Sequence, residues 1–213
     1  MYKIYINENA LILTDSQSVR EQKYTNKSLK APYSGKSKML LSYIDMLEKT
    51  NRFQSIIIHY HDYQKLKSDF LNLFVIKKAA GGLVINEFGQ GLFIHRRGYW
   101  DLPKGKKDLG EKSKATAVRE VKEETGVSQL ILKQKLLTTK HTYRVSNNKR
   151  AIKKTKWYLM EAPKQKLVPQ TEEDIIKAEW RPINLEQFSD VEIYKNIIDV
   201  VNSYLNESLK HSL

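Results

Sequence analysis

The sequence predicts a mixed α/β (α+β) protein, with a small N-terminal α/β domain before a larger domain. Three observations point to this class. Apolar residues recur at helical spacing in Met39–Leu47, and Ser55–Tyr60 (SIIIHY) is typical of a buried strand. A second helical stripe lies in a glutamate-rich stretch further along the chain. The expected domains are residues 1–73, of unknown role, and residues 74–213.

The first 73 residues show the order β-β-α-β-α. Tyr2–Ile6 and Ala10–Leu13 are short β-prone runs, joined by an expected turn at Asn7–Asn9. The polar stretch Thr14–Lys38 is expected to be loop with some helix. A helix is expected over Asp62–Leu73, because aspartate is a favourable N-cap residue. No motif here carries chemistry.

The larger domain alternates apolar runs with turn residues, and this pattern predicts several strands. Asparagine pairs and Gly-containing segments separate the runs. Strands are expected at residues 79–85, 92–95, 130–137, 141–145, 155–161 and 179–182, with a hairpin turn at 147–149 and a helix at 191–205.

The stretch from residue 105 to 127 reads GKKDLGEKSKATAVREVKEETGV. Ala115, Val118 and Val121 recur at helical spacing and are expected to form the buried stripe of a helix. Gly126 is expected to end that helix, because glycine readily adopts the left-handed conformation found there.

Several carboxylates share one region of this predicted helix. Glu120 and Glu124 are four residues apart and therefore lie on one face, which Glu123 borders. Arg119 precedes Glu123 by four residues and is expected to pair with it. Glu111, upstream, can fold back towards the group. Converging carboxylates repel one another unless a cation lies between them, and a hard ion such as magnesium or manganese suits oxygen ligands.

The same stretch resembles the box of the Nudix hydrolase family, G-x5-E-x7-R-E-U-x-E-E-x-G-U, where U is a bulky aliphatic residue. The alternative is a solvated, salt-bridged surface helix. That alternative does not require the two glycines and the arginine of the match. The matching positions are Gly105, Glu111, Arg119, Glu120, Val121, Glu123, Glu124, Gly126 and Val127.

The resemblance covers about residues 77–205 and implies a mixed β-sheet sandwiched between helices. It also implies hydrolysis of a diphosphate linkage between a nucleoside diphosphate and another group. By position in the box, Glu120 and Glu124 are the first expected metal ligands, and Glu123 is the next. Glu111 is an additional or outer ligand, and the backbone carbonyl of Lys104 is a further one.

The general base is open at this point. Members of the family use either a box glutamate, here Glu120 or Glu123, or an acid from a later loop, here Glu173 or its neighbour Glu172. Glu172 and Glu173 have an alternative interpretation, as acidic residues in the first turn of a helix. Arg119 is expected to orient Glu123, so its part in catalysis is indirect.

The segment W-D-L-P-K-G-K before the box resembles the branch that cleaves diadenosine and diphosphoinositol polyphosphates. Basic residues near the box can neutralise a long phosphate chain, and a tyrosine can stack on a base. Each lysine alone is equally typical of a solvated surface. The residues expected to bind substrate are Lys104, Lys106, Tyr143, Arg144, Lys153, Lys154 and Tyr99.

Composition narrows the partners. The chain has 37 Lys and Arg against 24 Asp and Glu, a net charge of +13, which favours polyanionic partners or simply solubility. With no cysteine, disulfides and thiolate metal sites are excluded. No signal peptide or long apolar run is present, so a cytoplasmic location without a membrane partner is expected. A small-molecule polyphosphate is the expected partner, a homodimer is one option, and nucleic acid is not favoured.

Alternative functions remain at the level of sequence. One is a Nudix activity on ADP-ribose, nucleoside triphosphates or RNA 5′ ends. Another is a ligand sensor or RNA-binding protein without catalysis. The complete set of glutamates argues for an enzyme, because a protein that only binds has no need of all of them.

Overall fold

The computed structural model describes residues 1–213 except 22–24, 146–148, 185, 187–191 and 211–213. The chain forms two compact units. The first comprises residues 1–77 and 140–153, and the second comprises residues 78–139 and 154–213. The division into domains at residue 73 stays a prediction.

The first unit contains a four-stranded sheet. Strand β1 (Tyr2–Ile6) pairs antiparallel with β2 (Asn9–Asp15), and β2 pairs parallel with β4 (Ser55–Tyr60). The edge strand β3 (Ser28–Pro32) runs parallel to β4. The end of β9 also reaches this unit, where His141 pairs with β1.

The turn between β1 and β2 is shorter than expected. Asn7 and Glu8 have φ angles of 47° and 60°, and the pair Ile6–Asn9 closes a two-residue hairpin. Positive φ at both central residues gives the twist that a tight hairpin requires. The predicted turn is therefore confirmed, but Asn9 already belongs to β2.

The stretch expected to be loop with some helix contains both the short helix α1 (Ser18–Glu21) and β3. The strand was missed because its sequence, SLKAP, is polar and ends in proline. Proline is tolerated on an edge strand because its missing N–H faces away from the sheet.

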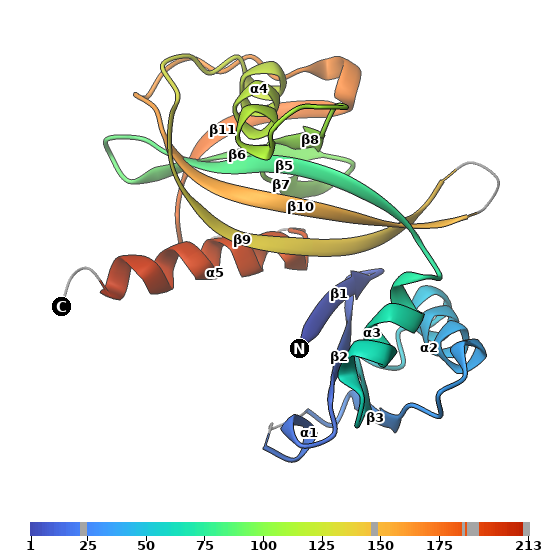
Figure 1. The fold of residues 1–213 in the computed structure, drawn as a ribbon. Helices are drawn as coiled ribbons and strands as arrows, with labels where there is room; N and C mark the ends of the chain where they lie inside the picture. Colours follow the sequence, from blue (N-terminus) through green and yellow to red (C-terminus); the bar gives the residue numbers. More distant parts are fainter. Residues whose placement is uncertain (22–24, 146–148, 185, 187–191, 211–213) are drawn as a thin grey trace. The chain divides into compact units, whose positions relative to one another are not determined.

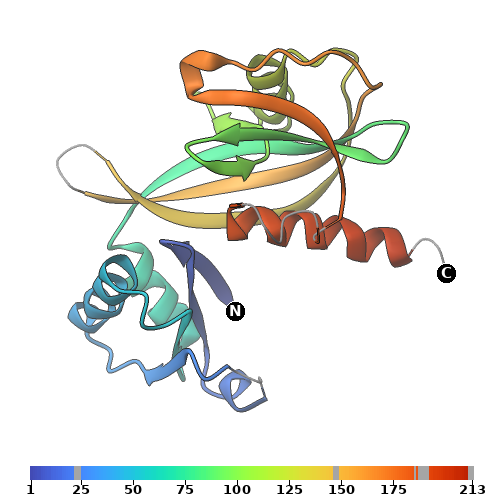
Figure 2. The ribbon, with the colours of Figure 1, turned by 180° about the vertical axis from the view of Figure 1, so that it is seen from behind.

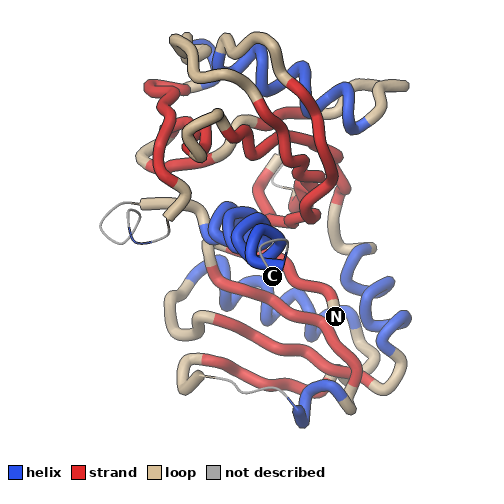
Figure 3. Tube along the Cα trace, turned by 90° about the vertical axis from the view of Figure 1, so that its left-hand side faces the viewer, coloured by secondary structure: helices blue, strands red, loops and turns tan. Residues whose placement is uncertain are grey.

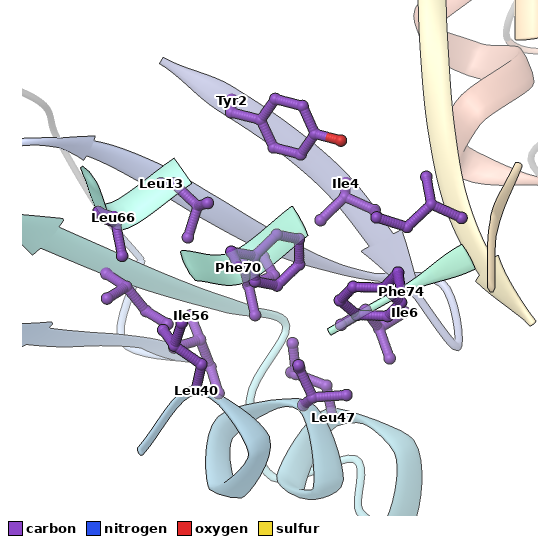
Figure 4. Packing of buried hydrophobic residues seen from close by; sticks show 14 of the residues in the cluster. Tyr2, Ile4, Ile6, Leu13, Leu40, Leu47, Ile56, Leu66, Phe70 and Phe74 are labelled. Atoms are coloured by element: carbon purple, nitrogen blue, oxygen red, sulfur yellow. The ribbon is translucent and has the colours of Figure 1, made fainter. Parts of the chain in front are cut away.

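Two helices, α2 (Ser37–Lys49) and α3 (Tyr63–Leu71), cover one face of this sheet (Figure 3). The expected cap of α3 is confirmed, since Asp62 Oδ1 accepts a hydrogen bond of 2.9 Å from the Lys65 N–H. Figure 4 shows the core between the layers, to which both helices and the strands contribute. Its labelled members are Tyr2, Ile4, Ile6, Leu13, Leu40, Leu47, Ile56, Leu66, Phe70 and Phe74.

The second unit is built on a mixed sheet in the order β11-β6-β5-β10-β9, with the short strands β7 beside β6 and β8 beside β5. The strands that build it are β5 (Val75–Ile85), β6 (Gln90–Arg96), β7 (Tyr99–Asp101), β8 (Lys104–Lys106), β9 (Ile131–Arg144), β10 (Arg150–Glu161) and β11 (Ile175–Pro182).

One helix packs on each face of this sheet, as Figures 1 and 2 show. Ala117 and Val121 of α4 (Ser113–Thr125) belong to the core on one face. Ile197 and Val200 of α5 (Lys195–Lys210) belong to the core on the other. The expected mixed sheet sandwiched between helices is confirmed. Among the described helices, none has the length and apolar character needed to cross a membrane.

Two expectations for this unit need correction. The strands expected at residues 130–137 and 141–145 form the single strand β9. The intervening Thr139 suits a strand, and its hydroxyl accepts a 2.8 Å hydrogen bond from the Trp157 indole. The last helix begins at Lys195 and runs on to Lys210, past the expected end at residue 205. The expected turn at 147–149 falls largely outside the described residues.

Candidate active site

Helix α4 carries most of the candidate residues. It ends at Gly126, which has a φ of 69° and donates its N–H to the Lys122 carbonyl at 2.8 Å. The predicted stop is therefore confirmed. Glycine relieves the strain that a side chain would suffer in this left-handed conformation.

The buried face of α4 is rotated from the expected one. Ala117 and Val121 are fully buried, whereas Ala115 is exposed and Val118 is only partly buried. The expectation for Ala115 was wrong, because several apolar stripes are possible in this sequence, whereas Val118 packs at the edge of the core. Threonines 116 and 125 add to the buried surface, which apolar periodicity does not reveal.

Strand β8 brings the backbone close to this helix. It pairs antiparallel with β5, so that Gly105 lies opposite Ala80 and Lys104 lies opposite Gly81. A Cβ atom on Gly105 would lie 1.8 Å from Glu120 Oε2, and one on Gly81 would lie 2.3 Å from the Pro103 carbonyl oxygen. Glycine at 81 therefore allows the close approach of two backbones, and glycine at 105 leaves room for the Glu120 carboxylate.

Glu124 is the most buried of the carboxylates, with 3% of its side chain exposed. Its Oε2 accepts a 2.8 Å hydrogen bond from the Lys104 N–H, and its Oε1 lies 3.7 Å from Arg96 Nη1. Burial raises the pKa of Glu124 to about 7, although the positive charges of Lys104 and Arg96 oppose that shift.

Arg119 is the centre of a second group of carboxylates. Its guanidinium contacts Glu111 at 3.1 Å, and its Nη1 lies 2.8 Å from both Glu120 Oε1 and Glu123 Oε2. It also donates to the Lys106 carbonyl at 3.1 Å. The predicted pair with Glu123 is confirmed, and the contacts with Glu111 and Glu120 extend it.

This guanidinium affects its partners differently. Its hydrogen bonds, with one from Thr116, lower the pKa of Glu111 to about 2. Burial raises the pKa of Glu120 despite the opposing charge of Arg119. Glu120 and Glu124 are thus the two box carboxylates whose negative charge burial disfavours most.

Within the described residues, no three His, Cys, Asp or Glu side chains are already gathered to hold a metal ion. The donors nevertheless suit a hard divalent cation, because they are carboxylates held against β8, at Lys104 for Glu124 and at Gly105 for Glu120. Such a cation would compete with Arg119 for Glu120 and Glu123. The residues therefore fit a metal in their chemistry, and binding it requires Arg119 to share them.

The residues predicted to bind substrate differ from one another in exposure and in the groups they contact. The Lys104 ammonium is buried and lies 2.7 Å from Asp101 Oδ2. Lys106 and Lys154 are exposed. The Tyr99 ring stacks on Tyr194, with centroids 4.5 Å apart.

Three further predicted contacts belong to the first unit. Arg144 pairs with Glu48 at 2.5 Å, and the Lys153 ammonium lies 5.6 Å from the centroid of the Tyr143 ring. The roles of all these residues in substrate binding stay predictions.

Glu172 and Glu173 lie on a single 3₁₀ turn, Thr171–Glu173, and are exposed. The helix that was the alternative reading for them does not continue, because Asp174 has a φ of 59° and β11 follows. The Gln170 N–H donates to the Glu124 carbonyl at 3.2 Å. This places the turn beside the C-terminal end of α4.

Three residues of the site were not singled out from sequence. Arg96 and Asp101 lie at the ends of β6 and β7, and Gly81 lies in the small-residue run of β5. The run Ala79–Gly82 was a usable signal, because consecutive small residues in a strand often mark close backbone approach. Asp101 lies in the W-D-L-P-K-G-K segment but was given no role of its own, and Arg96 had no local signal.

Comparison with known proteins matches more than half of the chain to one family. The family model described as NUDIX domain matches residues 75–199. The crystal structure of a C. elegans Ap4A hydrolase binary complex superposes with a TM-score of 0.50 at 19% identity, covering 63% of this chain and 98% of that one.

Two other solved structures are similar. A MutT protein from Methanosarcina mazei Go1 has a TM-score of 0.49 at 19% identity, covering 63% of this chain and 96% of that one. The Nudix hydrolase RenU from M. smegmatis has a TM-score of 0.47 at 19% identity, covering 66% and 89%. At these identities, the C. elegans likeness concerns the fold alone.

Proposed function

The chain belongs to the Nudix family of pyrophosphohydrolases, and on that premise we propose that it hydrolyses phosphoanhydride linkages of polyphosphorylated small molecules. The proposed reaction requires a divalent cation, and magnesium is the first candidate. Dinucleoside polyphosphates are the proposed substrate class. The reaction adds water across a P–O–P linkage and yields two phosphate-ended products.

One observation carries this proposal. Glu120 and Glu124 lie one helical turn apart on α4, and their carboxylates reach the consecutive residues Gly105 and Lys104 of β8. Largely buried carboxylates are costly unless positive charge compensates them, and here Arg119 lies 2.8 Å from Glu120 while Arg96 lies 3.7 Å from Glu124. The glycine at 105, which leaves room for Glu120, supports a site built for that arrangement.

In this proposal Glu120 and Glu124 are the principal metal ligands, with Glu123 next, Glu111 as an outer ligand and the Lys104 carbonyl as a main-chain ligand. When bound, the cation would neutralise phosphate oxygens and lower the pKa of water. Arg119 orients Glu123 and Glu120 through its Nη1, which lies 2.8 Å from each.

The proton acceptor is proposed to be Glu120, Glu123 or Glu173. Glu120 Oε1 and Glu123 Oε2 each lie 2.8 Å from Arg119 Nη1, so the same guanidinium holds both candidate carboxylates. Glu173 lies on the turn whose preceding residue donates to the Glu124 carbonyl. A carboxylate can act as a base only if it reaches the attacking water directly or through one other water.

The substrate class rests on charge. Lys106, on β8, and Lys154, on β10, are exposed and belong to the unit that carries the glutamates. Two exposed lysines favour more phosphate groups than a simple diphosphate presents. One structural neighbour is described as an Ap4A hydrolase, which agrees with this class but at 19% identity does not carry it.

A hydrolysis panel tests the proposal. Diadenosine tetraphosphate, an inositol pyrophosphate, ADP-ribose and nucleoside triphosphates would each be incubated with and without magnesium, and the products analysed. We expect the dinucleoside compound to be cleaved fastest and only with the metal. Faster cleavage of ADP-ribose would replace this substrate class with another.

The variant Glu124→Gln keeps the shape of the side chain and removes its charge, so we expect turnover to be lost with the fold intact. Glu161→Gln is the matched control, because Glu161 is exposed and its Oε2 forms a 2.7 Å surface ion pair with Lys133. Full activity of Glu124→Gln with magnesium would refute the metal-ligand role.

A further inference from the structure

Lys104 has a backbone and a side chain that do different things in this structure. We propose that Lys104 is a positioning residue for Glu124, anchored by Asp101, and that its ammonium does not contact the substrate. This inference rests on the proposed function and reverses the substrate-binding role expected for Lys104 from sequence.

The side chain of Lys104 is directed into the protein. Its ammonium lies 2.7 Å from Asp101 Oδ2, with 6% of the lysine and 5% of the aspartate side chain exposed. The other aspartate oxygen, Oδ1, accepts a 2.8 Å hydrogen bond from the Leu102 N–H. Leaving one partner of a buried ion pair without the other is strongly unfavourable, so the ammonium is not free to reach out to a phosphate.

The backbone of Lys104 is held from a second side. Strand pairing places Lys104 opposite Gly81, and the Gly82 N–H donates to the Pro103 carbonyl at 3.1 Å. A Cβ atom on Gly81 would lie only 2.3 Å from the Lys104 Cβ. Pairing with β5 therefore fixes the backbone of residue 104, and the ion pair with Asp101 fixes its side chain.

These two restraints fix the position of the Lys104 N–H, which is the donor that orients Glu124. The Lys104 N–H donates to Glu124 Oε2 at 2.8 Å, while Arg96 lies 3.7 Å from Oε1 on the opposite side of the same carboxylate. A carboxylate whose two oxygens face different positive or donor groups is held in one orientation. Movement of residue 104 would release Oε2 and let the group turn.

The alternative is that Lys104 binds substrate phosphate, and the two roles predict different measurements. A phosphate contact predicts a raised KM with unchanged metal affinity. A positioning role predicts weakened metal affinity and a lowered kcat. Asp101 separates the roles further, because its carboxylate is negatively charged and would repel a phosphate.

The experiment uses the full chain and Mn²⁺ alone as the probe. Affinity for Mn²⁺ would be measured by calorimetric titration for the variants Lys104→Met and Asp101→Asn and for the double variant. Lys166→Met is the matched control, since it removes an exposed lysine of the same unit to which no role in the site is assigned. Circular dichroism and thermal melting verify that each variant is folded.

We expect Asp101→Asn and Lys104→Met each to weaken Mn²⁺ binding about 10- to 100-fold, as is usual when support of a metal ligand is removed. The double variant should bind Mn²⁺ with about the same affinity as the weaker-binding of the two single variants, because the two side chains act as one unit. The double variant also leaves no unpaired buried charge, so it tests the inference even if a single variant unfolds.

Wild-type Mn²⁺ affinity in folded Asp101→Asn, or a raised KM alone in Lys104→Met, would overturn the inference. Additive losses in the double variant would do the same. If the wild-type chain binds Mn²⁺ but hydrolyses no anhydride in the panel, the proposed function fails, while the loss of Mn²⁺ affinity in the variants still supports the positioning role.

Discussion

Replacing Gly105 with alanine tests the geometry of the candidate site with the smallest possible change. The new methyl group would lie 1.8 Å from Glu120 Oε2 and 2.2 Å from its carboxyl carbon, whereas real contacts to Cβ atoms do not fall below 3.0 Å. Glu120 would have to move by roughly 1 Å or more to relieve the overlap.

The cost to stability should be small. The atoms met by the methyl group are the far end of a flexible side chain, and an off-rotamer side chain costs about 0.5–1.5 kcal/mol. For a chain of this size, that corresponds to a fall of roughly 1–6 °C in Tm. The loss of chain entropy in the unfolded state offsets part of it, by about 0.4–1 kcal/mol.

The cost to activity should be much larger. A displacement of about 1 Å in a catalytic group commonly lowers the rate about 100-fold. We therefore expect kcat/KM for the best substrate of the panel to fall about 100-fold in Gly105→Ala, with Tm nearly unchanged. Steady-state kinetics and thermal melting on the same preparation measure both quantities.

Two other glycines serve as controls. Gly81→Ala would bring its methyl group against backbone atoms of Pro103 and Lys104, at 2.3 and 2.8 Å, so it should destabilise the fold itself. Gly110→Ala meets nothing within 4 Å, and its φ of +77° should cost only about 1 kcal/mol. Wild-type activity in Gly105→Ala would show that the position of Glu120 does not matter for turnover, and would refute this reasoning.

Three further predictions follow from other parts of the chain. If Glu173 is the base, Glu173→Gln should lower kcat about 100-fold or more while Glu172→Gln leaves it within about twofold, and equal rates for the two would return the role to the box glutamates. Removing the N-cap of α3 with Asp62→Ala should cost about 1 kcal/mol in denaturant unfolding, and an unchanged midpoint would contradict this value. Hydrogen bonds from Ser18 lower the folded pKa of Asp15 to about 2, so their stabilisation is present above the unfolded pKa of about 4 and is lost as pH falls through 2. Ser18→Ala should reduce this acid sensitivity in melts taken between about pH 5 and pH 2, and identical pH profiles would argue against it.

Several features could be predicted from the sequence because they depend on neighbours along the chain. The stop of α4 at Gly126 and the cap of α3 at Asp62 both follow from backbone geometry within one turn. The pair Arg119–Glu123 follows from helical spacing alone. The spacing of the box also indicated the family, which the match over residues 75–199 then showed.

Features were predicted less well where the local sequence is compatible with more than one structure. The buried face of α4 includes Thr116 and Thr125 and leaves Ala115 exposed, because the sheet selects one face of a helix that has more than one apolar stripe. Strand β3 forms because β4 offers it a free edge, and its polar sequence alone does not favour it.

The sequence by itself determined that α4 would bear Glu120 and Glu124 on one face, since a helix repeats every 3.6 residues. Only the tertiary structure decided what those carboxylates contact. Lys104 reaches Glu124 across 20 residues because β8 pairs with β5 in one register, which also turns the lysine ammonium towards Asp101. Register and burial arise from packing of distant segments, and the charges of the site acquire their partners from that packing.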